Sequence, residues 1–353
     1  MPEARKKEPI TIADQGFFWV GVQRKKMPYG SIPTGQMYVQ YQIPAKQTHP
    51  YPLVLVHGGG GQGLDYMGTP DGREGWATWF LRKGYAVYVV DRPGHGRAPY
   101  HADALGPASP PATYEVLGDL FTRPAEKMPD AYPQAKLHTQ WPKRDAAGTE
   151  AILDQMLAGM GPMPTDLPAY QANMARVGGE LLDKIGPAVV MTHSMGGPSG
   201  WMMIEARPKL VKSMIAIEPF GPAFAKNQFG SLDWGLTSAP VTYDPPASHP
   251  EDLKRELKKA PRADLMDCYI QAEPARKLKN FGGIPILVMV AEASFLTPGS
   301  HGVVDFLKQA GADAELMRLE DHGIHGNGHA MMFESNSEDV AALLERWIAT
   351  KVK

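Results

Sequence analysis

Apolar runs recur along the chain, and their pattern predicts a buried and mostly parallel β-sheet. Near-continuous runs of Val, Ile, Leu and Met, such as "YPLVLVHG" and "PAVVMTHSMG", are typical of strands covered on both faces. These runs occupy residues 51–58, 85–94, 187–196, 211–221 and 284–292, and residues 314–321 are a further candidate. Two earlier segments, 16–23 and 35–44, alternate apolar and polar residues and predict an antiparallel start.

Helical patterns fall between most of these runs. They occupy residues 72–84, 167–186, 198–208, 302–311 and 337–351. This alternation of strand and helix predicts an α/β fold with a doubly wound sheet. Two stretches rich in Pro and aromatic residues break the alternation, at about 97–146 and 219–281. Long connections are usually functional, so we interpret both as cap or lid insertions in one domain that spans residues 1–353.

Composition narrows the class of protein. The hydrophobic fraction of 43% and the charged fraction of 21% are ordinary for a soluble globular protein. A net charge of −2 gives no reason to expect nucleic acid or an anionic membrane as a partner. The single cysteine, Cys268, excludes an internal disulfide and a site with several thiolates. No run is long enough to predict a membrane span. No signal peptide is evident, so we expect a cytoplasmic protein as written, or a secreted or periplasmic one if a signal was removed.

The glycine run "HGGGGQG" allows two interpretations. Gly58, Gly60 and Gly63 fit the G-x-G-x-x-G spacing of dinucleotide-binding loops. However, residues 64–72 separate the run from the next helical pattern, and Asp91 lies 33 residues after Gly58 instead of about 20. The run also fits the H-G-G-G loop that supplies an oxyanion-hole amide in lipases and esterases. The context favours this second interpretation.

An oxyanion loop requires a nucleophile on a sharp turn from strand to helix. "THSMGG" provides one, with Ser194 at its centre and Thr192 where the G-x-S-x-G pattern has its first glycine. A serine that merely caps a helix is the structural alternative. A buried strand before Ser194 and two glycines after it favour the nucleophile.

A serine nucleophile needs a base and an acid to orient that base. His322, His325 and His329 lie in the loop before the last helix, and we favour His329 because it lies nearest that helix. Two acids end apolar runs, Glu218 and Glu292. The usual α/β-hydrolase arrangement favours Glu292, whereas the strongly apolar surroundings of Glu218 favour that residue. These residues alone do not decide between the two acids.

Several stretches resemble a bacterial esterase family typified by an Alcaligenes esterase, to which sulfonylurea-herbicide esterases are related. They are "TPDGREGWATWFLRKGY", "VVDRPGHGRA", "HSMGG", "IEPFGP" and "HGNGHAMM". The resemblance implies an α/β-hydrolase fold, Glu218 as the acid, His329 as the base, oxyanion amides from Gly59 and Met195, and a homodimer. The family pattern has two adjacent cysteines where this chain has Gly59 and Gly60, so this loop lacks that cross-link. The segment 219–281 is longer than in short relatives, so the resemblance does not carry over the substrate range.

We therefore expect a serine carboxylic-ester hydrolase that forms an acyl-enzyme, without a cofactor or metal, on a small to medium apolar or aryl ester. The residues expected to line its pocket are Gly60, Phe220, Trp141, Trp201 and Trp234. One alternative is other chemistry on the same scaffold, such as a lyase or a cofactor-free haloperoxidase. A metallohydrolase built on His322, His325 and His329 is another, which the intervening glycines disfavour. A non-catalytic binding protein is the fourth possibility.

Overall fold

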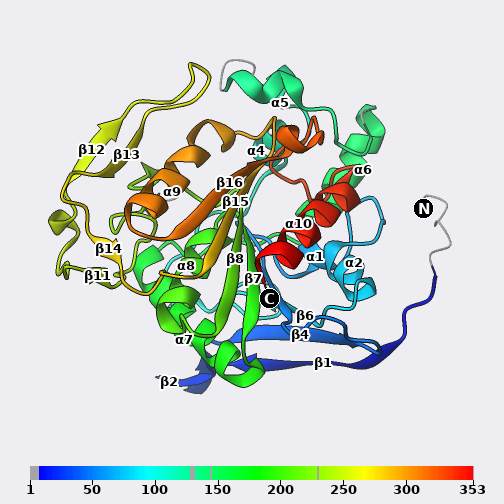
Figure 1. Cartoon of the computed structure of the whole chain (residues 1–353). Helices are drawn as coiled ribbons and strands as arrows, with labels where there is room; N and C mark the ends of the chain where they lie inside the picture. Colours follow the sequence, from blue (N-terminus) through cyan, green and yellow to red (C-terminus); the bar gives the residue numbers. More distant parts are fainter. Residues whose placement is uncertain (1–7, 128–131, 144, 229, 353) are drawn as a thin grey trace.

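The computed structural model describes residues 8–127, 132–143, 145–228 and 230–352 (Figure 1). Its described part contains an eight-stranded mixed sheet in the order β1-β4-β6-β5-β7-β8-β15-β16. The strands are β1 (Ile12–Val20), β4 (Met37–Pro44), β6 (Val87–Asp91), β5 (Leu53–Val56), β7 (Ala188–His193), β8 (Val211–Ile217), β15 (Pro285–Val290) and β16 (Asp313–Arg318). β1 and β4 pair antiparallel, as do β4 and β6, and every later pair in this order is parallel. The predicted antiparallel start and parallel body are confirmed.

Helices cover both faces of this sheet. On one face lie α7 (Leu167–Ile185), α8 (Gly196–Ala206) and α9 (Thr297–Gln309), and on the other α2 (Trp76–Arg82) and α10 (Ser337–Lys351). Strand β5 contributes to both cores: Val54 packs on the first face and Leu55 on the second, and both side chains are fully buried. Burial of one such side chain contributes about 1.5–3 kcal/mol. This two-sided burial explains why the central strands are continuous apolar runs.

The first insertion is mainly helical. It contains α3 (Ala102–Leu105), α4 (Tyr114–Phe121), α5 (Pro124–Lys127), the 3-10 helix η1 (Pro133–Leu137) and α6 (Ala146–Leu157). Figure 1 shows α4, α5 and α6 together at the top of the view. Part of this region, at 128–131 and 144, lies outside the described residues. The helices place the insertion between β6 and α7, as the sequence indicates, and extend it beyond residue 146.

The second insertion is built from short strand pairs. They are β9 (Lys226–Asn227) with β10 (Gly230–Ser231), β11 (Tyr243–Asp244) with β14 (Lys277–Leu278), and β12 (Arg255–Lys258) with β13 (Cys268–Gln271). The 3-10 helix η2 (Pro250–Asp252) lies among them. The buried residues of this insertion, among them Trp234, Tyr243 and Phe281, belong to the hydrophobic core on the face of α8 and α9. This insertion therefore packs on the flank of the sheet, on the left of Figure 1.

Three smaller elements complete the described chain. A hairpin of β2 (Gln23–Met27) and β3 (Gly30–Thr34) follows β1, and the 3-10 helix η3 (Leu319–His322) follows β16. The short helix α1 (Leu64–Met67) directly follows the glycine run. The sequence pattern did not predict α1, because Tyr66 alone among its residues is buried and no apolar face repeats. No helix in the described residues is both long and apolar enough to cross a membrane.

Candidate active site

Ser194 occupies a strained turn between β7 and α8. Its φ of 52° lies in the left-handed region, which costs a non-glycine residue about 1–3 kcal/mol and is often found at active sites. Backbone hydrogen bonds fix this conformation: the Ser194 N–H donates to the Ile217 carbonyl at 3.0 Å, and the Ser194 carbonyl accepts from the N–H groups of Gly197 and Phe220, each at 2.9 Å. The turn is therefore held from both β8 and α8.

Thr192 stands where the G-x-S-x-G pattern has its first glycine, and a glycine in the following helix leaves space for its larger side chain. Thr192 is fully buried. A β-carbon at Gly200, on α8, would lie 2.8 Å from Thr192 Cγ2 and 2.2 Å from Met214 Cε. The absence of a side chain at Gly200 thus provides the space that the Thr192 methyl group occupies.

Glu218 and His329 form a buried hydrogen bond beside this turn. Glu218 directly follows β8 and has a φ of 43°, and its Oε2 atom lies 2.5 Å from His329 Nδ1. The carboxylate also accepts from the Ala291 N–H at 2.7 Å and from the Ser294 hydroxyl at 2.6 Å. His329 and Glu218 are 2% and 0% exposed. Ser294 is not among the predicted site residues, because its contact with Glu218 depends on the turn that follows β15.

Burial sets the charge state of this pair. It lowers the pKa of His329, so the imidazole is neutral over the physiological range. Burial also raises the pKa of Glu218, against the opposing effect of the hydrogen bonds from Ser294 and Ala291. With Glu218 ionised, its carboxylate accepts a hydrogen bond from Nδ1–H, which leaves the Nε2 lone pair of His329 available. A neutral imidazole in this tautomer can act as a general base.

The alternative acid and histidines face elsewhere. Glu292 Oε1 lies 3.2 Å from Nδ1 of His325, and Glu292 Oε2 accepts from the Gly326 N–H at 2.8 Å. The His325 side chain is 62% exposed, and His322 is exposed at the end of η3. The three histidines of the loop therefore do not converge. Within the described residues, no group of three or more His, Cys, Asp or Glu side chains is arranged to hold a metal ion.

The glycine-rich loop after β5 lies against the Ser194 turn. A β-carbon at Gly58 would be 2.9 Å from Ser194 Cβ, so only glycine allows this approach. His57 anchors the loop: its Nε2 accepts from the Arg92 backbone N–H at 3.1 Å, and its Nδ1–H donates to the Gly58 carbonyl at 3.0 Å. The Arg92 guanidinium donates to the Gly59 carbonyl at 2.5 Å. Two consecutive peptide groups of the loop are thus fixed by side chains.

The predicted oxyanion amides belong to residues that border Ser194. Met195 is the N-cap of α8, with a partly exposed side chain. Among the described residues, neither the Met195 N–H nor the Gly59 N–H donates a hydrogen bond. Both groups are available to an acceptor, and the positive end of the α8 dipole adds to the field at Met195. The carbonyl of Gly60 accepts from the Gly161 N–H at 2.8 Å, which joins the loop to the segment before α7.

Of the four aromatic residues expected in the pocket, three lie in the hydrophobic cores and one, Phe220, lies beside the Ser194 turn. Trp201 and Trp234 lie in the core on the face of α8, and Trp141 packs in the opposite core. Phe220 is buried beside the Ser194 turn, to which its N–H donates. Among the described residues, the His193 imidazole has its centroid 4.5 Å from that of His329. The partly exposed rings of Phe295 and Phe121 also lie beside His329, with centroids 4.7 and 5.5 Å from that of His329.

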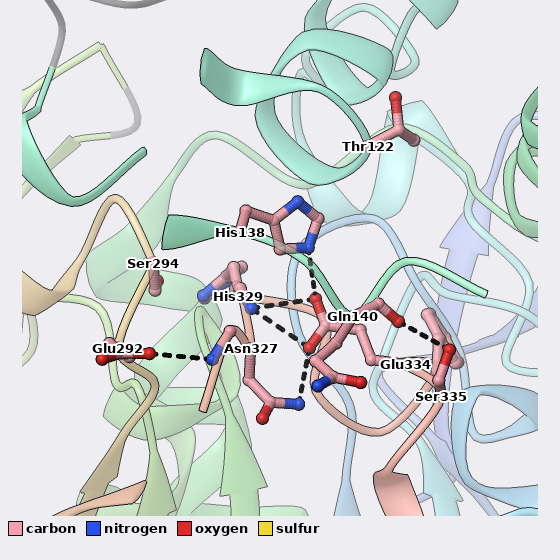
Figure 2. Close-up of polar contacts among 12 residues, drawn as sticks. Thr122, His138, Gln140, Glu292, Ser294, Asn327, His329, Glu334 and Ser335 are labelled. Carbon is pink, nitrogen blue, oxygen red and sulfur yellow. Dashed lines mark hydrogen bonds and ion pairs between the residues drawn. The ribbon is translucent and has the colours of Figure 1, made fainter. Parts of the chain in front are cut away.

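A second buried carboxylate supports the loop that carries His329. Figure 2 shows His138 and Asn327 directed at the carboxylate of Glu334. His138 Nε2 lies 2.8 Å from Glu334 Oε1, and Asn327 Nδ2 donates to Glu334 Oε2 at 2.8 Å. No sequence pattern predicts this cluster, because His138 and Glu334 are 196 residues apart.

Comparisons with known proteins identify the family of the chain. A sequence profile described as "Alpha/beta hydrolase family" matches residues 53–343. The chain is 37% identical to the "Probable secreted lipase phiG" of Fungal sp. (strain ATCC 74256), over 94% of this chain and 88% of that protein. It is 26% identical to a solved structure described as a novel bacterial esterase, with a TM-score of 0.69 and coverage of 100% of both chains. By the extent of the profile match and the identity to the fungal relative, this chain belongs to the alpha/beta hydrolase family.

Proposed function

We propose that this protein is a serine carboxylic-ester hydrolase that uses Ser194, His329 and Glu218. The observation that carries the proposal is the buried Glu218–His329 hydrogen bond at the same sheet edge as the strained Ser194 turn. An acid, a base and a nucleophile that follow different parallel strands meet at the carboxyl edge of an α/β sheet, where sites form. The relatives named as a lipase and an esterase support the same class of reaction.

The reaction follows from the assigned tautomer. His329 Nε2 takes the proton of the Ser194 hydroxyl while Ser194 Oγ attacks the ester carbonyl carbon. The N–H groups of Gly59 and Met195 stabilise the oxyanion, and Glu218 stabilises the imidazolium that forms. When the tetrahedral intermediate collapses, the alcohol leaves with the proton from His329. Water then attacks the acyl-serine carbonyl carbon while His329 takes its proton. The acyl–Oγ bond breaks, Ser194 Oγ takes the proton from His329, and the carboxylic acid is released.

The surroundings of His329 support an apolar or aryl ester as substrate. Phe121 comes from the first insertion and Phe295 from the turn after β15, and their rings lie 6.3 Å apart in an edge-to-face arrangement. Tyr132 contributes a third ring, 6.5 Å from that of Phe295. Such an aromatic lining favours an apolar group beside the reacting carbon. In this proposal, residues 97–146 act as the cap.

The test combines covalent labelling with a substrate series. A fluorophosphonate should label the wild-type protein at Ser194, and Ser194→Ala should lose both the label and at least about 10³-fold of ester hydrolysis, because the residues of a triad act as a unit. p-Nitrophenyl esters of rising chain length and methyl arylcarboxylates would then define the acyl preference. Hydrolysis by Ser194→Ala at the wild-type rate would exclude the proposal.

We also propose that the protein forms a homodimer. Phe17 and Trp19 are 60% and 43% exposed on β1, at the edge of the sheet. Exposed apolar residues on an edge strand favour pairing with another chain. Light scattering of the wild type and of Phe17→Ser with Trp19→Ser tests the dimer, which should dissociate in the double variant.

Export of the protein from the cell is a separate proposal. It is supported by the fungal relative, which is named as secreted, and fractionation of the native host tests it.

A further inference from the structure

Glu334 lies in the interior, five residues after His329, and its carboxylate holds the loop that presents the base. The Gly328 N–H donates to Glu334 Oε1 at 2.9 Å and to Oε2 at 3.1 Å, and the Asn327 amide donates to Oε2 at 2.8 Å. Glu334 and Asn327 are fully buried. The two residues directly before His329 are therefore oriented by one carboxylate.

A further donor to Glu334 comes from the first insertion. His138 follows η1, is 7% exposed, and contacts Glu334 Oε1 at 2.8 Å. The chain after His138 runs along the base loop: the N–H groups of Thr139 and Gln140 donate to the Gly326 carbonyl at 2.9 and 3.1 Å. The Gln140 carbonyl accepts from the N–H of Ser335 at 2.8 Å and from the Ser335 hydroxyl at 3.0 Å, the contact drawn in Figure 2.

The segment that carries Glu334 is also fixed from the other side. The Arg73 guanidinium donates to the Phe333 carbonyl at 2.6 Å, and the Trp76 indole donates to the Ser337 carbonyl at 2.9 Å. These contacts give a structural reason for the stretch "TPDGREGW". A segment pinned at Phe333 and Ser337 provides a stable base from which Glu334 can hold Gly328.

The charge of Glu334 also affects the pKa of His329. Titratable or charged side chains around this region include His138 on the first insertion, His193 at the end of β7, His329 on the loop, Glu218 after β8, Arg73 before α2 and Tyr132 before η1. The negative charge of Glu334 favours the protonated form of His329, and so opposes the effect of burial on the pKa of His329. During turnover His329 becomes an imidazolium, and a second anion nearby stabilises that form.

We infer that Glu334 is a positioning residue for His329, and that His138 makes the first insertion part of the support of the catalytic base. This inference rests on the proposed function, in which His329 is the base. The carboxylate acts through the Gly328 and Asn327 contacts and through its charge. The His138 contact transmits any displacement of the insertion to the loop that holds the imidazole.

The experiment compares Glu334→Gln, His138→Leu and His138→Gln with wild type. Glutamine at 334 directs an amide N–H₂ at a donor, Asn327 or His138, so one buried donor loses its acceptor. We expect kcat and the rate of fluorophosphonate labelling to fall about 10- to 100-fold in Glu334→Gln, with KM within about threefold. His138→Leu should lose about tenfold in kcat, and His138→Gln, which keeps a donor, should recover most of this loss.

A pH profile separates positioning from simple stability. The acid limb of kcat/KM should move to lower pH in Glu334→Gln, because removal of an anion lowers the pKa of His329. His325→Ala is the matched control, since it removes the other His–Glu pair of the same loop, which is exposed. It should leave kcat and the acid limb unchanged.

Three results would decide against the inference. One is a folded Glu334→Gln with wild-type kcat and acid limb, and another is a lowered melting temperature with both kinetic measures unchanged. If Glu334→Gln does not fold, equal kcat in His138→Leu and wild type overturns the inference. Failure of the proposed function is distinguishable, because it would show as retained hydrolysis in Ser194→Ala.

Discussion

Glu292 bonds to His325, with Oε1 and Nδ1 3.2 Å apart, while Glu218 bonds to His329 at 2.5 Å. The two acids that the sequence could not separate thus have different partners. The Glu292 pair lies at the surface, where the His325 side chain is 62% exposed, and the Glu218 pair is buried. A hydrogen-bonded pair at an exposed position contributes little, whereas a buried and fully satisfied one fixes the orientation of its members.

Substitution of the two acids should therefore have unequal effects. Glu218→Gln preserves shape but removes the charge that stabilises the imidazolium, and should reduce kcat by about 10³–10⁴-fold. Glu292→Gln should change kcat by less than about tenfold, because its partner is not the base. Steady-state kinetics on one p-nitrophenyl ester, with circular dichroism to verify folding, provides the comparison. A larger loss in Glu292→Gln than in Glu218→Gln would refute the assignment of the acid.

Substitution of the three histidines in the loop before the last helix should also have unequal effects on activity. His329→Ala removes the base and should lower kcat by at least about 10³-fold, with fluorophosphonate labelling slowed in parallel. His325→Ala and His322→Ala should retain most of the activity, because both side chains are exposed. If His325→Ala were the inactive variant, the base would have to be reassigned.

The sequence predicts the sheet well because strands that are buried on both faces appear in it as continuous apolar runs. Leu53–Val56 is entirely apolar since alternate residues enter opposite cores. The turn at Ser194 could also be recognised, because crowding there restricts the neighbouring residues to small ones. Local patterns of this kind depend on a few consecutive residues, so no knowledge of the tertiary structure is needed to read them.

The surroundings of the base could not be predicted in the same way. The contacts of His138 with Glu334 and of Phe121 with His329 join residues distant in the chain. Neither pair has a spacing that a sequence pattern could reveal. Trp201 and Trp234 are expected in the pocket because one follows the Ser194 turn and the other belongs to the second insertion, but an aromatic side chain fills a core equally well, and both lie in the core.

His95 should make the fold less stable in acid. Burial, with the charge of Arg92, lowers the pKa of His95 to about 3, below its unfolded value of about 6.5. Between these values the unfolded chain binds a proton that the native chain does not, so the free energy of unfolding falls as pH decreases from about 6.5. His95→Gln should reduce this slope by about 1.4 kcal/mol per pH unit. Urea unfolding of both proteins at pH 6.5, 5.5 and 4.5 measures it, and identical slopes would contradict the prediction.

The fit between Thr192 and Gly200 predicts a coupled pair of substitutions. Gly200→Ala places a β-carbon 2.8 Å from Thr192 Cγ2 and 2.2 Å from Met214 Cε, distances that force the helix or its neighbours to shift. Overpacking of this kind costs about 1–3 kcal/mol, although alanine is the better helix former. The end of the Met214 side chain is flexible and can move aside, whereas the Thr192 methyl group is fixed on a buried strand.

Thr192→Gly in the Gly200→Ala background should therefore recover part of the lost stability, and it also restores the G-x-S-x-G pattern. A double-mutant cycle of urea unfolding free energies measures the coupling, with ester hydrolysis reporting whether the Ser194 turn is displaced. Additive effects of the two substitutions would mean that Thr192 and Gly200 do not share the space assigned to them.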